Sequence, residues 1–206
     1  LYCFNFSHSV SYSVDSYYSG WLHTHHEKEW LATVLQSAKP DNLNVMISEI
    51  KQQGYKFAQI DVNHSGVQWE FSEDLQAFVP PLTSMKGIGE AAMAEIIQER
   101  PYHALDDLLF LPDGSWRHSK FNKTAFKALC AVEGFGSLRE MQDGSISNHA
   151  QLYSIIIDGY NQLKKGRSLK VKKGQPPNEP QLDKMLVDTF GTPDWTRAVK
   201  ISNFME

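Results

Sequence analysis

Apolar residues recur at helical spacing along the first quarter of the chain. Between residues 10 and 25 the apolar and aromatic positions fall three or four residues apart, which is the spacing of one helix face. The same pattern predicts a second helix that ends near Ala38, before a proline. A third helix is predicted to begin at Asp41, as its N-cap, and to end at Gly54. Residues 1–54 are therefore predicted to be helical.

The pattern then changes to short alternating runs. Apolar and polar residues alternate over 55–60, 67–71 and 76–79, and Asn, Ser, Gly and Asp residues separate these runs, which is typical of short strands. The pair Pro80-Pro81 marks a boundary. Helices joined by tight turns are predicted again over 82–140. The sequence thus indicates a mainly α fold with a small β element.

The last third of the chain is predicted to be a helical tail interrupted by a basic segment. A helix is expected over 148–163, and shorter ones near 181–190 and 194–204. Lysine and arginine dominate 164–173, and the Pro and Gly residues around that run favour a flexible linker. Such a run could contact phosphate, or it could simply be a solvated linker.

Composition narrows the possible classes of protein. The chain has 206 residues, of which 41% are hydrophobic, and no apolar stretch approaches the length of a membrane helix. Its formal net charge is −4, so any contact with DNA must be local. The cysteines, Cys3 and Cys130, lie far apart, which fits a reducing cytoplasm. Because the chain begins at Leu1 without a signal-peptide pattern, we expect a fragment of a longer cytoplasmic protein.

The sharpest motif is a predicted hairpin between two helices. An apolar segment ends at Met85, and Lys86-Gly87-Ile88-Gly89 follows before a second amphipathic segment. Glycines allow positive φ and a close approach to a ligand, and amides at the start of a helix attract phosphate. We interpret Ile88 as the apolar contact between the helices and Lys86 as an additional charge. The alternative is an ordinary turn capped by glycine.

A second and weaker copy of this motif is predicted at Glu133-Gly134-Phe135-Gly136. The glutamate occupies the place of Lys86, which argues against a phosphate contact, and a purely structural turn is the alternative. Two adjacent hairpins of this kind would track one DNA strand by its backbone without reading its sequence.

Histidines near the end of the first helix do not predict a metal site. His23 and His25 project about 200° apart on a helix, so the two cannot share one ion well, although His23 and His26 could. No cysteine, aspartate or glutamate nearby completes a set of four ligands. No metal site is predicted in this chain.

Six segments of the chain carry motifs that occur in the same order in one known family. The segments are 4–12, 21–25, 29–30, 60–65, 86–90 and 96–100. The first contains Phe-Asn-Phe-Ser-His-Ser, and the fifth is the Lys-Gly-Ile-Gly-Glu of the predicted hairpin. In these motifs the chain resembles the alpha subunit of bacterial DNA polymerase III, the C-family replicative polymerase. That family has Phe-Asn-Lys-Ser-His-Ser in the first segment, where Phe6 stands in place of the lysine, and a helix-hairpin-helix motif with Lys-Gly-Val-Gly-Glu in the fifth. The resemblance covers residues 1 to about 140.

The resemblance implies three regions. Residues 1–79 would form the C-terminal part of the polymerase fingers, 80–140 a tandem helix-hairpin-helix unit that grips duplex DNA, and 141–206 a helical tail with a basic linker. It implies that Asn5, Ser7 and His8 lie near the incoming nucleotide or the template. The residues expected to contact DNA are Lys86, Gly87, Ile88, Gly89, Gly134 and Gly136.

The resemblance also implies that chemistry occurs elsewhere. The family holds its catalytic Mg²⁺ with paired aspartates of a palm domain, and the aspartates of this chain show no such pattern. We therefore expect no catalytic residue or cofactor in this segment, with Mg²⁺ in the palm, and a segment inactive alone. Expected partners are primer–template DNA, the remainder of the alpha subunit and a sliding clamp. The family binds the clamp through a short motif that begins with glutamine. The closest segment of this chain is Gln181-Leu182-Asp183-Lys184-Met185-Leu186, and it matches only loosely because Lys184 occupies an apolar position of the motif.

Two functions from other classes stay open at this point. The chain could be a free-standing helix-hairpin-helix DNA-binding accessory protein, or a protein-interaction domain without a role in DNA binding. An upstream reading frame that encodes paired aspartates would favour the polymerase.

Overall fold

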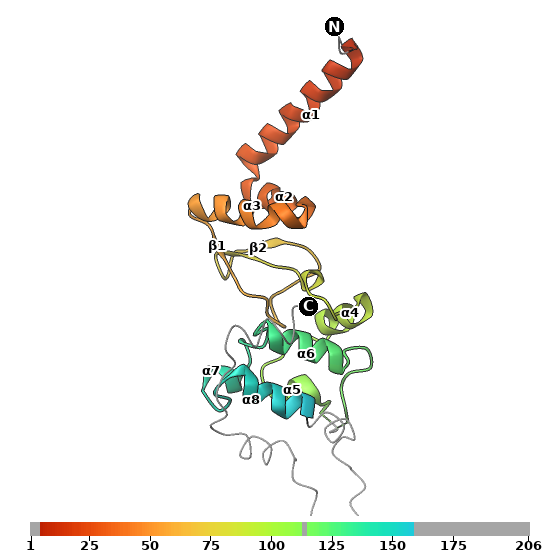
Figure 1. Ribbon diagram of the computed structural model, residues 1–206, viewed down its shortest axis with the longest axis vertical. Helices are drawn as coiled ribbons and strands as arrows, with labels where there is room; N and C mark the ends of the chain where they lie inside the picture. The colour runs from red at the N-terminus through yellow and green to blue at the C-terminus, as the bar shows by residue number, and fades with distance from the viewer. Residues whose placement is uncertain (1–4, 113–114, 159–206) are drawn as a thin grey trace, which may run out of the picture. The chain divides into compact units, whose positions relative to one another are not determined.

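The computed structural model describes residues 5–112 and 115–158, and they form two compact units (Figure 1). The first unit contains the chain up to Ala58 and then 68–80, and the second contains 59–67 and the chain from Pro81 onward. The chain therefore leaves the first unit after its first strand and returns for the other two. Cys3, the basic linker and the predicted clamp motif lie outside the described residues.

Three helices open the first unit, as their apolar spacing predicts. They are α1 (Phe6–His25), α2 (Glu27–Ser37) and α3 (Pro40–Gln52). The expected N-cap Asp41 is wrong by two residues: Lys39 is the N-cap, and Pro40 occupies the first turn, where a missing amide hydrogen costs no helical bond. Gly54 adopts φ +97° directly after α3, which confirms it as the helix stop.

A three-stranded sheet completes the first unit. Its strands are β1 (Lys56–Phe57), β2 (Glu70–Ser72) and β3 (Ala77–Val79). Strand β3 lies in the middle, parallel to β1 and antiparallel to β2. Phe78 at its centre is fully buried, with the rings of Tyr55, Phe57 and Phe71 packed around it at centroid distances of 5.1–5.5 Å. Leu31 and Leu35 of α2 belong to the same core.

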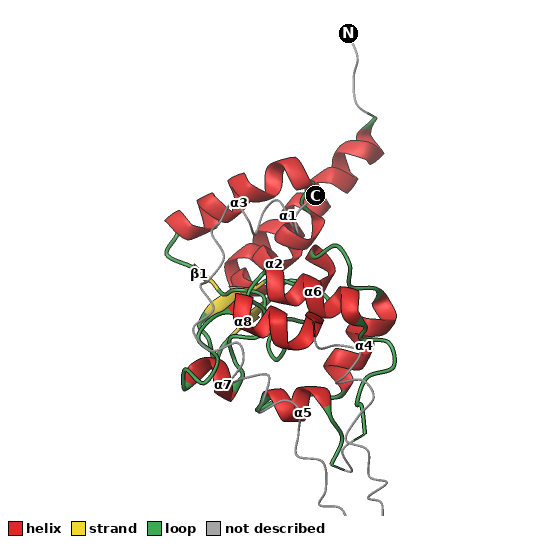
Figure 2. Cartoon of the chain, turned by 60° about the horizontal axis from the view of Figure 1, so that its bottom comes forward, coloured by secondary structure: helices red, strands yellow, loops and turns green. Residues whose placement is uncertain are grey.

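The second unit consists of short helices (Figure 2). They are η1 (Leu82–Ser84), α4 (Glu90–Gln98), α5 (Leu105–Leu109), α6 (Lys123–Ala131), α7 (Arg139–Gln142), α8 (His149–Tyr153) and η2 (Ser154–Asp158). The hydrophobic core of this unit contains more residues than that of the first unit. Phe126 and Leu129 of α6 are completely buried at the centre of this core. The helix predicted from residue 148 begins as α8 and continues as the π-turn η2. These elements confirm the prediction of a mainly α fold with a small β element.

Asparagine side chains cap two helices of the second unit, α6 and α8. The Asn122 side-chain oxygen accepts hydrogen bonds from the amides of Thr124 and Ala125, at 2.9 and 3.2 Å, and so caps α6. Asn148 caps α8 in the same way through the amide of Gln151. Among the residues described here, no helix combines the length and the apolar character needed to cross a membrane.

Candidate nucleic-acid interface

The predicted first hairpin is a tight turn that leads into α4. Its first arm is shorter than predicted, because Leu82–Ser84 form one 3₁₀ turn instead of an α-helix. The turn is anchored by three side chains that are buried in the core of the second unit, those of Leu82, Met85 and Ile88. Lys86 and the two glycines on either side of Ile88 stay exposed. The structure therefore places Ile88 as the apolar contact between the two arms, and the rest of the turn faces outward.

The two glycines of this turn have different conformations. Gly87 adopts φ +98°, which side chains rarely tolerate, and a Cβ there would lie 3.4 Å from the Thr124 methyl group. Gly89, the N-cap of α4, has φ −83° and ψ 161°, an extended conformation that any residue adopts. A Cβ at Gly89 would meet nothing within 4 Å. The fold therefore requires glycine at Gly87 but leaves open space in front of Gly89.

This open space faces unpaired amides. Within the part of the chain that the structure describes, the backbone amides of Gly87, Ile88 and Gly89 donate no hydrogen bond. The carbonyl of Gly89 accepts the first helical hydrogen bond from Met93 at 3.0 Å, so the amides at the start of α4 also point outward. Exposed amides at the positive end of a helix dipole suit a phosphate oxygen. Glu90, the first residue of α4, is exposed beside them.

The predicted second hairpin has the same sequence pattern but another geometry. It connects α6 to α7, and Phe135 at its centre is fully buried. Here the positive φ, +60°, belongs to Glu133 instead of to a glycine. Gly134 is buried, and a Cβ there would lie only 2.7 Å from the Leu129 Cδ2 atom. Its amide donates to the Leu129 carbonyl at 2.8 Å, so packing explains this glycine.

A carboxylate of the chain itself occupies this second turn. One oxygen of Asp61 accepts the amide of Ser137 at 3.0 Å, and the other accepts the Ser137 hydroxyl at 2.7 Å. The second oxygen also accepts the amide of Asn63 at 2.8 Å and lies 3.1 Å from His64 Nδ1. A Cβ at Gly136 would lie 4.0 Å from the carboxylate. Asp61 therefore takes hydrogen-bond donors that a bound phosphate would need.

The segment 59–67 is held in the second unit by further polar contacts, which sequence reasoning missed. The Asn63 side chain donates to the Tyr102 carbonyl and to the Ser137 hydroxyl, at 2.7 and 2.8 Å. The Arg100 guanidinium donates to the Val62 carbonyl at 2.6 Å and also to the Ser65 carbonyl. Two of the family landmarks, 60–65 and 96–100, are thus partners of one another. Only the polar character of 61–65 could have indicated such a role.

A second carboxylate shapes the loop before α6. Glu95 accepts the amides of Ser119, Lys120 and Phe121. Burial raises the pKa of Glu95, but these amides outweigh it, so the pKa lies below its ordinary value. His118 is buried beside it and bonds the Leu108 carbonyl through Nε2 at 2.6 Å. Burial lowers the pKa of His118 more than that carbonyl raises it.

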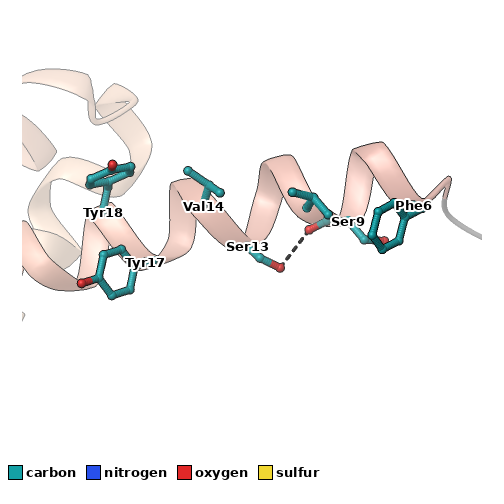
Figure 3. Close-up of a pocket in the computed structure, with 7 residues that line it drawn as sticks. Phe6, Ser9, Ser13, Val14, Tyr17 and Tyr18 are labelled. Atoms are coloured by element: carbon teal, nitrogen blue, oxygen red, sulfur yellow. Dashed lines mark hydrogen bonds between the residues drawn. The ribbon is translucent and has the colours of Figure 1, made fainter.

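The residues predicted to lie near the nucleotide are all on the first helix or directly before it. Asn5 is the N-cap of α1, and Ser7 and His8 are in its first turn, all exposed. His8 packs against the Tyr12 ring at a centroid distance of 4.5 Å. No residue of α1 is buried, and Figure 3 shows its side chains, Phe6 among them, projecting from the ribbon. The structure therefore leaves this helix accessible.

The histidines that follow on α1 contact aromatic rings. His23 lies 4.6 Å from the Trp30 ring, and His25 lies 4.7 Å from the Trp21 ring, between centroids. Across residues 5–112 and 115–158, no three histidine, cysteine, aspartate or glutamate side chains gather as metal ligands would. Asp106 and Asp107 are in the first turn of α5, where they face the positive end of the helix.

Comparisons with known proteins identify relatives of this chain. A family model of the helix-hairpin-helix motif matches residues 54–144. The DNA polymerase III subunit alpha of Buchnera aphidicola subsp. Schizaphis graminum is 34% identical over 177 residues, 84% of this chain and 14% of that protein. That of Chlamydia muridarum is 27% identical over 158 residues, 74% of this chain and 12% of that protein. The chain thus spans only about a seventh of the length of these relatives, and the matches confirm the resemblance predicted from the landmarks.

Proposed function

Because the chain is related in sequence to one segment of the DNA polymerase III alpha subunits, we propose that it holds duplex DNA by the sugar–phosphate backbone. The contact is the first hairpin, Lys86 to Gly89. The single observation that carries this assignment is the set of unpaired amides at the exposed glycines Gly87 and Gly89, with open space in front of Gly89. The match of this region to the helix-hairpin-helix family supports it.

The chemistry of this contact is backbone recognition without reading of bases. The amides of Gly87 and Gly89 donate to one phosphate, and the dipole of α4 adds a favourable field. Lys86 contributes a positive charge beside them. A glycine at the N-cap lets the phosphate approach more closely than any side chain would allow. Contacts of this kind fix the position of a duplex and carry no sequence preference.

The second hairpin takes another role in this proposal. Gly134 and Gly136 were expected to contact DNA, but Gly134 is buried and Asp61 occupies the turn. A second anion at this place would meet a carboxylate at short range. We therefore confine the phosphate contact to the first hairpin and assign the second turn to holding the segment 59–67.

Nucleotidyl transfer would be supplied by the remainder of the polymerase. In this proposal Asn5, Ser7 and His8 on the exposed start of α1 face the nucleotide or template, as the resemblance implies. Mg²⁺ would be held by aspartates of the palm in another part of the protein. The remainder of the alpha subunit and a sliding clamp are the further partners, and the segment alone does not extend primers.

The hairpin is tested by one substitution that the fold tolerates. Gly89→Val adds a side chain into open space with an allowed φ, so it should block the phosphate without disturbing the protein. Gly20→Val in α1 is the matched control, because a Cβ there also meets nothing within 4 Å. We expect Gly89→Val to weaken binding to a labelled duplex about 10- to 100-fold, the value of charge-assisted hydrogen bonds. Equal affinity of the two variants would refute the assignment.

The wider role is tested by primer extension. The chain alone should extend no primer, and activity should require a palm-containing part of a DNA polymerase III alpha subunit. Extension by the unaided chain in the presence of Mg²⁺ and deoxynucleotides would contradict the proposal. Gly89→Val should lower the extension obtained with the added part, whereas Gly20→Val should not.

A further inference from the structure

The first hairpin lies directly on helix α6. A Cβ at Gly87 would be 3.4 Å from the Thr124 methyl group and 3.5 Å from the Ala128 Cβ. The turn therefore rests on the face of α6 that carries Thr124 and Ala128. Lys123 precedes the first contact residue and Lys127 precedes the second, and both lysines are exposed. Lys123 and Lys127 are therefore each one residue along α6 from a residue that lies beside the hairpin.

This surface is locally basic on a chain that is acidic as a whole. The net charge of the chain is −4, yet α6 contains no aspartate or glutamate. Lys120 lies just before α6, and its backbone amide is held by Glu95 at 2.8 Å. The same carboxylate accepts the amides of Ser119 and Phe121 and the Ser119 hydroxyl. Glu90, at the start of α4, is the nearest acidic side chain in sequence to the hairpin.

We infer that Lys120, Lys123 and Lys127 extend the hairpin into one continuous surface for the backbone of duplex DNA. The inference rests on the proposed function and adds the extent of the site and the residues that widen it. The hairpin amides hold one phosphate, and the lysines neutralise neighbouring phosphates. Lys123 and Lys127 are four residues apart on a helix, so their side chains leave the same face about 6 Å from each other. Helix α6 would then lie along the duplex.

The salt dependence of binding distinguishes this surface from a merely solvated helix face. Each lysine that neutralises a phosphate releases a counterion and adds about 0.9 to the slope of log K against log salt. The double variant Lys123→Gln, Lys127→Gln keeps the helix, because lysine and glutamine have similar helix propensities. We expect it to lower the slope by about 1.8 and to weaken binding at 0.15 M salt about 30-fold.

The control is a second double variant with the same net charge as the Lys123→Gln, Lys127→Gln variant. Lys39→Gln with Lys56→Gln removes two exposed lysines from the first unit and should leave slope and affinity close to those of the unchanged protein. All forms are full 206-residue chains, titrated by fluorescence anisotropy with the same 20-base-pair duplex from 0.05 to 0.3 M salt. Circular dichroism checks that each remains folded.

The results separate this inference from the proposed function. If Gly89→Val weakens binding but the Lys123 and Lys127 variant behaves like its control, the extended surface is wrong and the hairpin contact stands. If the lysine variant shows a lower slope of log K against log salt while Gly89→Val binds the duplex normally, the lysines bind DNA and the hairpin assignment fails. If neither variant binds the duplex more weakly than its control, both the hairpin contact and the extended surface are wrong.

Discussion

Removing the carboxylate of Asp61 should destabilise the second unit without weakening DNA binding. The side chain is only 13% exposed, and it accepts the Asn63 amide, the Ser137 amide and the Ser137 hydroxyl within 3.0 Å. Hydrogen bonds to a charged group contribute about 1.5–3 kcal/mol when buried. Because water can reach part of this site, we take only about 1 kcal/mol for each of the three bonds and expect Asp61→Ala to cost about 3 kcal/mol in total.

Unfolding experiments measure this cost. At about 2–4 °C per kcal/mol for a chain of this size, Asp61→Ala should lower the melting temperature by about 6–12 °C. Asp61→Asn keeps one acceptor oxygen and should lose about half as much. Asp74→Ala, at an exposed aspartate of the first unit, is the control and should change stability by less than about 0.5 kcal/mol.

Duplex binding by the same variant tests the assignment of the second turn. Below its melting temperature, Asp61→Ala should bind duplex DNA at least as tightly as the unchanged protein, because a negative charge has been removed from a turn that does not hold phosphate. A stability loss below about 1 kcal/mol would refute the anchoring role of Asp61. A loss of affinity as large as that of Gly89→Val would refute the restriction of the phosphate contact to the first hairpin.

Three further predictions concern the interior of the second unit. Gly134→Ala should cost about 1–3 kcal/mol in urea unfolding, because its methyl group would overlap Leu129, whereas Gly136→Ala should be nearly neutral. Burial lowers the pKa of His118 in the folded state below its value in the unfolded state. The stability that this neutral histidine contributes is therefore present above about pH 6.5 and is lost as the pH falls toward the folded-state pKa. The melting temperature of His118→Gln should consequently depend less on pH between pH 7 and 5 than that of the unchanged protein. Burial raises the pKa of the Cys130 thiol, so iodoacetamide at pH 8 should label this residue only after unfolding, as peptide mass spectrometry would show.

Local features were predictable from the sequence because each depends on neighbours along the chain. The three- and four-residue spacing of apolar positions predicted α1, α2 and α3. Glycine after a periodic segment predicted the positive φ of Gly54. Strands β1 and β3 fall inside the predicted alternating runs, and β2 ends one residue past its run. Asp41 was expected as an N-cap, but the proline before it begins the helix and moves the cap to Lys39.

The contacts of the segment 59–67 could not be predicted, because its partners are far away in sequence. Asp61 binds Ser137, 76 residues later, and Asn63 binds Tyr102, 39 residues later. Alternation and helical periodicity describe how one element buries its own face, and they carry no information about which polar groups meet. From the sequence, the short polar residues of 59–67 between two strands therefore predict only a loop, although in the structure this segment anchors the second hairpin.

The two hairpins show why one sequence pattern supports two different uses. Glycine–apolar–glycine gives both turns a buried central side chain, Ile88 or Phe135. In the first turn the positive φ falls on Gly87 itself, and the following glycine remains at an open N-cap. In the second turn Glu133 adopts the positive φ, so Gly134 sits one place further into the core. A shift of one residue in where the backbone reverses thus decides the state of the first glycine of each turn. The amide of Gly87 donates no hydrogen bond and is open to a phosphate, whereas the amide of Gly134 donates to the Leu129 carbonyl.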